Sequence, residues 1–459
     1  MTEYRIEYDS IGEKKVPVNA YYGVQSMRGA ENFQISGRRV HPELVRAITE
    51  VKKAAAITNR DAGVIEPRIA NAMAAACDEI LEGKLLDNFI VDAIQGGAGT
   101  SLNMNANEVI SNRAIEILGG RLGDYSIVHP NDHANRAQST NDACPTAGKI
   151  AAIRLLYKAI GELELFSAAL GSKAEEFNHV IKMGRTEMQD AVPISFGQVF
   201  RAYKRAADRD IRRFKEAIAE LSEINMGGTA IGTGLNADKS YINNIVPNLA
   251  KLTGLELTQA EDLVDSTQNL DCFVFVSGIV KSAATNISKI ANDLRLMSSG
   301  PRAGLQEITL PAKQNGSSIM PGKVNPVIAE VVNQIAFNII GNDTTITLAA
   351  EAGQLELNAF EPIIFYRLFE SLETLANGVR IFTKDCIEGI VVNEERCKEE
   401  VDRSIGIVTA LCPYIGYTKA ANLAKQALRE EKSIRALVLE QGIIDEASID
   451  EVLDPKKMI

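Results

Sequence analysis

The middle of the chain has a hydrophobic pattern that predicts long helices. Apolar residues recur every three or four positions from Ile150 to Phe177 and again from Val199 to Ile224. This spacing places them on one face of an α-helix. A third run, Val276 to Leu294, begins apolar nearly all round, which predicts that this end lies in a deep core or between subunits. Helices of roughly 30 residues without internal stops exceed the usual globular length, so the pattern predicts a long helix bundle.

The segments on either side of these helices have shorter patterns. Residues 1–139 alternate short helical stretches with Gly- and Asn-rich loops, and from about Val392 the helical signals shorten around Pro413 and Gly416. We therefore predict a mainly α chain with three domains. They are an N-terminal mixed helical domain over 1–139, a central long-helix bundle domain over 140–391 and a small C-terminal helical domain over 392–459.

Composition supports a helical, acidic globular protein. The 459 residues include no Trp and only 5% aromatic residues, which suits aliphatic helix packing better than a sandwich or barrel. Lys and Arg number 49 against 60 Asp and Glu, a formal net charge of −11. That balance argues against a nucleic-acid or acidic-membrane partner, because either needs a basic face.

Nothing in the sequence resembles a targeting or membrane segment. The N-terminus lacks a basic region followed by an apolar stretch, and the most apolar segment, Phe273–Val280, is far shorter than the ~20 residues of a membrane helix. The six cysteines are scattered without a CxxC pair, which predicts reduced thiols. We expect a cytoplasmic protein with no membrane partner.

Four polar loops interrupt the helical pattern, and each is expected at or near a helix start. They are Gln95–Ser101, Gln138–Asp142, Gly184–Asp190 and Gly300–Pro326; Pro145, after the second, suits a first helical turn. Free backbone N–H groups, Ser and Thr hydroxyls and the positive helix end favour a carboxylate or phosphate there. For any one loop, the alternative is that Ser, Thr and Asn only cap a helix.

Other chemistries fit the sequence poorly. The Gly97–Gly99 segment is followed by Leu102 where a dinucleotide fingerprint needs its third glycine, and no predicted strand precedes it. His129 and His133 are four residues apart, but the proline between them argues against a shared helix face. No HExxH, CxxC or EF-hand spacing occurs, so we expect no cofactor and no metal-binding residues.

The fourth loop carries a specific motif. Its Gly316–Pro326 segment, GSSIMPGKVNP, resembles the signature of the fumarase/aspartase superfamily, lyases that eliminate water or an amine from a succinate-type skeleton. The likeness extends along nearly the whole chain, through YYGVQ at Tyr21–Gln25, ENF at Glu31–Phe33, QGGAGTS at Gln95–Ser101, NMNANE at Asn103–Glu108, QSTNDA at Gln138–Ala143 and GTGLN at Gly232–Asn236.

Several stretches resemble the aspartase branch of this superfamily. YYGVQ stands where hydratases have YWGAQ, QSTNDA where they have SSND, and EAGQLELN at Glu351–Asn358 where they have SNGNFELN. The resemblance implies reversible deamination of L-aspartate to fumarate and ammonia without an organic cofactor. It leaves open fumarate hydration, a lyase for a substituted aspartate, and activation by a divalent cation. A non-catalytic protein with this fold is a further alternative, against which intact Ser317, Lys323 and Asn325 argue.

The resemblance also implies roles for single residues. Ser317 is the base that removes the β-proton, with loop N–H groups and Lys323 stabilising its alkoxide. The resulting aci-carboxylate dianion requires preformed hydrogen-bond donors. By resemblance, the β-carboxylate is held by Thr100, Ser139, Thr140 and Ser318, the α-carboxylate by Thr186, Lys323 and Asn325, and the amino group by Asn141.

Glu187 departs from the family pattern, which has His or Gln after GRT. A carboxylate there repels the substrate's carboxylates unless it is protonated or faces the substrate ammonium. Our hypothesis is that Glu187 contacts the ammonium; the alternative is that it points away and pairs with a lysine or arginine. Arg28, after YYGVQ, either assists the site or forms a salt bridge, and we favour the latter. Finally, the resemblance implies a homotetramer in which loops of three subunits build each active site.

Overall fold

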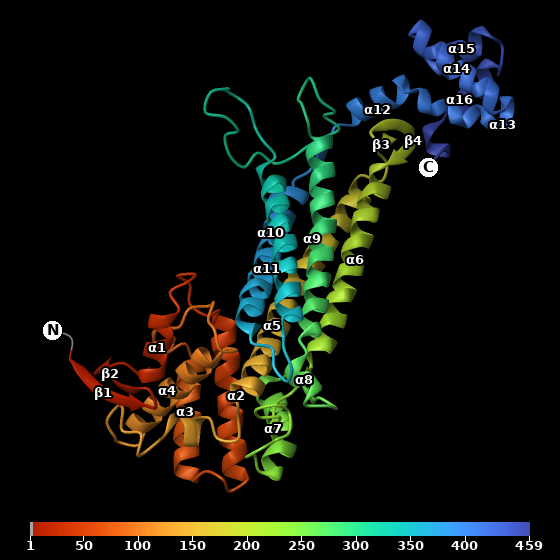
Figure 1. Cartoon of the computed structure of the whole chain (residues 1–459). Helices are drawn as coiled ribbons and strands as arrows, with labels where there is room; N and C mark the ends of the chain where they lie inside the picture. The colour runs from red at the N-terminus through yellow and green to blue at the C-terminus, as the bar shows by residue number, and fades with distance from the viewer. Residues whose placement is uncertain (1–2) are drawn as a thin grey trace. The chain divides into compact units, whose positions relative to one another are not determined.

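The structure is a computed structural model that describes residues 3–459 (Figure 1). Its residues group into two compact units, which we call unit 1 (Met1–Ile160, Arg212–Ser282 and Phe337–Leu375) and unit 2 (Gly161–Ile211, Ala283–Ala336 and Ala376–Ile459). The division into three domains stays a prediction. Five long helices contribute residues to both units: α5 (Thr140–Glu176), α6 (Phe196–Leu221), α9 (Asp271–Met297), α10 (Val327–Glu351) and α11 (Glu361–Phe382). The mainly α class and the long-helix pattern are confirmed.

Aliphatic and aromatic side chains hold these helices together within each unit. In unit 1, Phe273 of α9 packs edge-on against Phe365 of α11, with ring centroids 5.4 Å apart. In unit 2, Phe166 of α5 stacks on Phe382 of α11 at 5.7 Å. Such offset and edge-to-face contacts are the favoured aromatic geometries. The three-and-four spacing seen in the sequence therefore corresponds to the buried faces of these helices.

The remainder of unit 1 is a helical assembly with two small sheets. Strands β1 (Tyr4–Asp9) and β2 (Gly12–Pro17) form an antiparallel hairpin, and β5 (Glu223–Ile224) pairs in parallel with β6 (Thr258–Gln259). Helices α2 and α3 both begin with proline, whose fixed φ suits the first helical turn. The helices are α1 (Val24–Asn32), α2 (Pro42–Asp61), α3 (Pro67–Leu81), α4 (Thr100–Ile117), α7 (Lys239–Thr253), α8 (Asp265–Gln268) and the short turns η1 (Leu86–Asn88) and η2 (Pro130–Ala134).

Unit 2 also contains two small sheets and a cluster of C-terminal helices. β3 (Ile181–Thr186) and β4 (Gln189–Ser195) form a hairpin, and β7 (Ile308–Thr309) pairs with β8 (Val391–Val392). Met183 of β3 belongs to the buried core of the C-terminal helices, together with Leu411 and Leu437. These elements are η3 (Thr383–Ile387), α12 (Glu394–Arg403), η4 (Ile405–Leu411), α13 (Cys412–Ile415), α14 (Tyr417–Glu430), α15 (Ile434–Glu440), α16 (Glu446–Val452) and η5 (Pro455–Lys457).

Three of the four polar loops lead directly into helices, at the starts of α4, α5 and α10, as predicted. The expectation for Gly184–Asp190 was wrong, because this segment is the turn region of the β3–β4 hairpin and α6 begins only at Phe196. Pro145 lies inside α5 and not in its first turn, because the helix already begins at Thr140. Over residues 3–459, no helix combines the length and apolarity required to cross a bilayer.

Candidate active site

The predicted site residues divide between the two units. Thr100, Ser139, Thr140 and Asn141 belong to unit 1. Unit 2 contains the hairpin turn with Thr186 and Glu187, and the signature loop with Ser317, Ser318, Lys323 and Asn325.

The first loop places Thr100 at the N-terminus of α4. Gly99 precedes it with a φ of +88°, and a Cβ atom there would lie 3.1 Å from Cys144 Sγ. Glycine is therefore required both by its backbone conformation and by the close approach of α5. The Thr100 hydroxyl donates to the Gly97 carbonyl oxygen at 2.7 Å, and its side chain is exposed. The backbone N–H of Leu102 donates to Gln95 Oε1 at 2.9 Å, so the loop presents mainly an exposed hydroxyl at the positive end of a helix, which favours an anion.

The second loop is organised by the buried carboxylate of Asp142. It accepts hydrogen bonds from the backbone N–H of Ser139 at 2.9 Å, of Gly227 at 3.2 Å and of Thr229 at 3.0 Å. Burial raises the pKa of Asp142 to about 6, although these three donors act in the opposite direction. Asp142 therefore joins the Ser139–Asn141 loop to the segment at residues 227–229.

Asn141 is oriented by the same segment. Its Nδ2 group donates to the Ala230 carbonyl oxygen at 2.7 Å. The backbone carbonyl oxygen of Asn141 accepts from Asn225 Nδ2 at 3.0 Å. One of the two amide N–H groups is thus engaged, and Oδ1 is the atom of the side chain that can accept from a ligand. An amide oxygen accepts hydrogen bonds, so this orientation suits a donor such as an ammonium group.

A buried hydrogen-bond network around Lys52, which was not predicted from the sequence, contacts the second loop through Gln138. Lys52 of α2 donates from Nζ to Asn135 Oδ1 and to Gln138 Oε1, each at 2.9 Å. Asn135 Oδ1 also accepts from Asn103 and Asn107 of α4, each at 3.1 Å. Burial lowers the pKa of Lys52 to about 8. Its signal in the sequence is a lysine on the apolar face of α2, the helix of the VKKAAAI segment.

A second buried carboxylate, Glu108, anchors the chain after the first hairpin. It accepts from the backbone N–H of Gly23 at 2.8 Å, of Gln25 at 2.8 Å and of Ser26 at 3.0 Å, and from the Ser26 hydroxyl. Burial raises its pKa to about 7. The YYGVQ and NMNANE motifs thus meet in one structural contact.

Arg28 forms the salt bridge that we favoured for it. Its Nε and Nη2 atoms contact the two Asp9 carboxylate oxygens at 2.8 and 3.0 Å. The Arg28 hydrogen bond lowers the pKa of Asp9 below its ordinary value. A bidentate pair of this kind fixes the guanidinium on the β1–β2 turn.

Thr186 and Glu187 lie at the tip of the β3–β4 hairpin. Glu187 and Met188 both have positive φ, 52° and 66°, as in a tight two-residue hairpin turn. Both Thr186 and Glu187 are exposed. In the part of the chain that the structure describes, Glu187 forms no ion pair, so the alternative that it pairs with a lysine or arginine finds no support within one chain.

The signature loop is closed at its base by backbone contacts. The Gly316 N–H donates to the Lys323 carbonyl oxygen at 2.7 Å, and Asn325 Nδ2 donates to the Gly316 carbonyl oxygen at 2.7 Å. A Cβ atom on Gly316 would lie 2.5 Å from the Lys323 carbonyl oxygen and 2.8 Å from the Asn325 nitrogen. This close crossing needs glycine. Asn325, predicted to bind the α-carboxylate, therefore also closes the loop.

Within this loop, the Ser317 hydroxyl oxygen faces two backbone N–H donors. This Oγ atom accepts from the backbone N–H of Ile319 at 3.2 Å and of Met320 at 2.9 Å. Donors aimed at an oxygen stabilise its ionised form. Ser318 and Lys323 are exposed on the same loop, where they remain available to a substrate.

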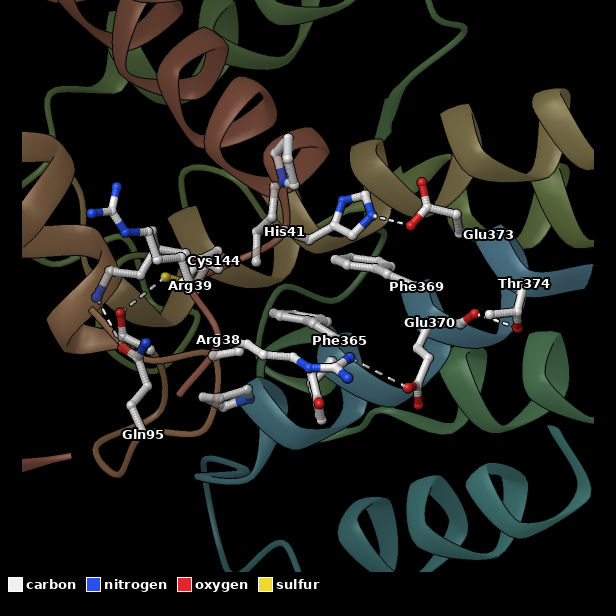
Figure 2. A pocket seen from close by; sticks show the side chains of 18 residues that line it. Arg38, Arg39, His41, Gln95, Cys144, Phe365, Phe369, Glu370, Glu373 and Thr374 are labelled. Carbon is white, nitrogen blue, oxygen red and sulfur yellow. Dashed lines mark hydrogen bonds and ion pairs between the residues drawn. The ribbon is translucent and has the colours of Figure 1, made fainter. Parts of the chain in front are cut away.

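A cavity of about 420 Å³ in unit 1 is lined by Gln95 and Gly99 of the first loop and by residues of α2, α5 and α11 (Figure 2). Figure 2 shows stacked Phe365 and Phe369 on its wall, with Arg38 facing Glu370 at 3.7 Å and His41 facing Glu373 at 3.6 Å. Because its walls are mainly apolar and its cations already face carboxylates, this cavity does not suit a dicarboxylate. The loops themselves are the better candidate.

Residues 3–459 contain no group of three or more His, Cys, Asp or Glu side chains placed to hold a metal ion. His129 and His133, which share a four-residue spacing, are joined locally, because the His129 N–H donates to His133 Nδ1 at 2.8 Å.

Comparisons with known proteins agree with the geometry. A family model described as lyase matches residues 12–341, and one described as fumarase C C-terminus matches residues 407–459. The aspartate ammonia-lyase of Bacillus subtilis is 53% identical over 99% of this chain and 96% of its own length, and that of Escherichia coli K12 is 48% identical over 99% and 96%. Among solved structures, the fumarate lyase:delta crystallin from Brucella melitensis bound to cobalt superposes with a TM-score of 0.97 at 47% identity, and class II fumarase from Schistosoma mansoni with 0.96 at 36%; both cover 99% of each chain.

Proposed function

We propose, from the premise that this chain belongs to the lyase family of the fumarases and aspartases, that it catalyses the aspartate ammonia-lyase reaction. The observation that carries this function is the 48–53% identity to aspartate ammonia-lyases of several bacteria over nearly the full length. The chain is thus a carbon–nitrogen lyase that converts L-aspartate to fumarate and ammonia, reversibly. The same family membership and the intact site residues argue against a non-catalytic protein.

In the proposed mechanism, Ser317 removes the proton from the β-carbon. Its Oγ accepts two backbone N–H bonds, from Ile319 and Met320, which stabilise the alkoxide that acts as base. The electron pair of the broken C–H bond moves into the β-carboxylate, giving an aci-carboxylate dianion. When this dianion collapses, the C–N bond breaks and ammonia leaves from the opposite face.

The loops then divide the two substrate carboxylates between them. We assign the β-carboxylate to Thr100, Ser139, Thr140 and Ser318, and the α-carboxylate to Thr186, Lys323 and Asn325. The hydroxyls and helix N-termini around the β-carboxylate form hydrogen bonds that strengthen as negative charge develops on it. These local donors must bind a dianionic substrate against the repulsion of a chain whose formal net charge is −11.

The amino group is assigned to Asn141 and Glu187. The Asn141 amide is held by Ala230, and its Oδ1 atom is an acceptor that matches the N–H donors of an ammonium group. Glu187 adds a negative charge that favours ammonium over water as the leaving group. If Glu187→Gln left both the KM for aspartate and the preference for aspartate over malate unchanged, this role would be wrong.

The assembly we propose is a homotetramer whose active sites combine loops from three subunits. An unpartnered apolar stripe on α10 supports it: Phe337, Ile340 and Leu348 are exposed on one helix face, 64%, 42% and 62% respectively. Exposed apolar stripes of this kind mark subunit interfaces. Because the site residues divide between the two units, subunit contacts offer a means to bring their loops together.

We further propose that the enzyme needs no organic cofactor and works in the cytoplasm. The elimination is complete with a base and hydrogen-bond donors, so no electron sink is required. All six cysteines are free, five of them buried, as expected of a reducing compartment.

The function is tested by incubating the purified chain with L-aspartate, L-malate and N-substituted aspartates while following the ultraviolet absorbance of fumarate. We expect fumarate from aspartate and little from the others. Faster turnover of malate would favour a hydratase, and turnover of a substituted aspartate would favour a different amine. Ser317→Ala is the matched inactive variant, and its retention of activity would contradict the assigned base.

A further inference from the structure

A buried ionic cluster lies at the foot of the β3–β4 hairpin in unit 2. Arg185 donates from Nη1 to Glu307 Oε1 and from Nη2 to Glu400 Oε2, each at 2.8 Å. Lys182 Nζ also contacts Glu307 Oε1, at 3.2 Å. The Glu307 side chain is fully buried, and the Arg185 and Glu400 side chains are only 17% and 15% exposed.

The two carboxylates that Arg185 bridges belong to different elements. Glu307 lies inside the Gly300–Pro326 loop, where its N–H donates to the Met297 carbonyl oxygen at the end of α9 and its carbonyl oxygen accepts from the Asn393 N–H, each at 2.9 Å. Glu400 lies on α12, where Arg396 contacts it at 3.2 Å. Both anchors are thus fixed to secondary structure.

The β3–β4 hairpin itself also contacts residues that follow α12. Asp190, which faces Arg185 across the hairpin, accepts from the Ser404 hydroxyl at 2.7 Å, immediately after α12. Gly406 approaches the Ala191 carbonyl oxygen so closely that a Cβ atom would lie 2.1 Å from it. Only the turn, with Thr186 next to Arg185 and exposed Glu187 and Met188, projects without such contacts.

We propose that Arg185 is a positioning residue whose bridge between Glu307 and Glu400 sets the place of the Thr186–Glu187 turn for substrate binding. This inference rests on the proposed function, since it takes Thr186 as a ligand of the α-carboxylate. Arg185 does not itself touch substrate. Its rigid guanidinium fork holds two carboxylates in fixed directions, whereas a lysine ammonium is a point charge on a flexible stem and does not fix that geometry. The same bridge links the turn to Glu307 in the first half of the Gly300–Pro326 loop.

The kinetic test compares Arg185→Lys with the wild type. We expect the KM for aspartate to rise about tenfold while kcat stays within about threefold, because charge is kept and only the geometry of the turn is lost. The matched control is Arg435→Lys, which alters another bidentate arginine of unit 2, bound to Asp450 at 2.7 and 3.1 Å and remote in sequence. It should leave KM and kcat unchanged.

A spectroscopic test is independent of activity. The chain contains no Trp, so Met188→Trp places a single tryptophan, which can be excited apart from the 11 tyrosines, at the turn, where Met188 is 65% exposed. In that background, Arg185→Lys should lower the fluorescence anisotropy and increase acrylamide quenching, while Arg435→Lys should change neither. If wild-type enzyme were inactive on aspartate, the proposed function would fail while this measurement still tested the turn.

Two results would overturn the proposal. One is an Arg185→Lys variant with unchanged KM and unchanged anisotropy; the other is a variant that loses only thermal stability and kcat, as a merely structural residue would. If Arg185→Lys does not fold, Glu400→Gln carries the test, because it leaves the Arg185–Glu307 pair intact. We expect it to raise KM about threefold, and an unchanged KM would contradict the positioning role.

Discussion

The backbone N–H of Thr229 donates a 3.0 Å hydrogen bond to the buried carboxylate of Asp142. Because the same carboxylate accepts from the Ser139 N–H, the loop at residues 139–141, for which we propose substrate binding, depends on a buried carboxylate outside the proposed set of substrate ligands. Burial raises the pKa of Asp142 from 3.8 to about 6. A folded pKa above the unfolded one favours the protonated folded state below pH 3.8, and this advantage is lost as pH rises through about 6.

Activity should depend on pH in the opposite sense to stability. The ionised carboxylate accepts from three N–H groups, and protonation weakens that arrangement, so kcat/KM should fall as pH drops below about 6. Asp142→Asn should lower kcat/KM about tenfold at pH 8, equivalent to roughly one hydrogen bond, and should abolish this acidic limb. Initial rates between pH 5 and 9 measure both effects. Asp265→Asn, in the short helix α8, is the control and should keep the wild-type profile; a surviving limb in Asp142→Asn would contradict the assignment.

Glu108 should make stability depend on pH in a calculable direction. Burial raises its pKa from 4.5 to about 7, so its stabilising contribution is complete below pH 4.5 and is lost as pH rises through about 7. That change in pKa corresponds to about 3 kcal/mol. Glu108→Gln does not titrate, so the unfolding free energy of wild type minus that of the variant should decrease by up to about 3 kcal/mol between pH 4.5 and 8. Urea unfolding of both proteins measures the difference.

The exposed Glu261, changed to Gln, is the control for Glu108 and should give a difference that does not vary with pH. A Glu108→Gln difference that is flat across the same range would show that the three backbone donors and the Ser26 hydroxyl fully offset burial, and one that increases with pH would show that they outweigh it.

Gly316→Ala should inactivate the enzyme without unfolding it. The added Cβ would meet the Lys323 carbonyl oxygen at 2.5 Å and the Asn325 nitrogen at 2.8 Å, which forces the base of the signature loop apart and displaces Ser317. A displacement of about 1 Å at a reacting group costs about 100-fold in rate, so we expect kcat to fall by that order. Steady-state kinetics and thermal unfolding together measure the effect.

The matched control lies in the same loop. Gly322 has a positive φ of +82°, and a Cβ there has open space. Gly322→Ala therefore carries only the left-handed backbone cost of roughly 1–2 kcal/mol and should reduce kcat less than Gly316→Ala. If the two variants behaved alike, the close crossing at Gly316 would not explain the loss.

The parts of the molecule that sequence could predict are those determined locally. The periodicity of Ile150–Phe177 corresponds to α5, and the residues around GSSIMPGKVNP identify both the family and the loop before α10. The β3–β4 hairpin was missed because its register shifts between Met183 and Arg185, which interrupts the alternation expected of a strand.

Contacts between residues far apart in the sequence could not be predicted either. Arg185 and Glu400 are 215 positions apart, and Lys52 and Asn135 are 83 apart. Their partners depend on tertiary packing, and a single sequence contains no pattern that pairs them. For the same reason Asp142 was recognised as part of a motif but not as the carboxylate that joins two loops.

The apolar stripe on α10 gives the last prediction, which concerns assembly. Phe337 and Leu348 are 64% and 62% exposed, and burial of such side chains stabilises an interface by about 1.5–3 kcal/mol each. The double variant Phe337→Glu with Leu348→Glu removes this stabilisation and places two negative charges at the interface of every subunit. Sedimentation or light scattering at micromolar protein should then show dimers or monomers in place of tetramers. Activity should fall in parallel, because each site is proposed to need three subunits. Tyr417→Glu, at an 81% exposed position on α14, is the control and should leave both mass and activity unchanged. A double variant that remained a fully active tetramer would place the subunit interface elsewhere.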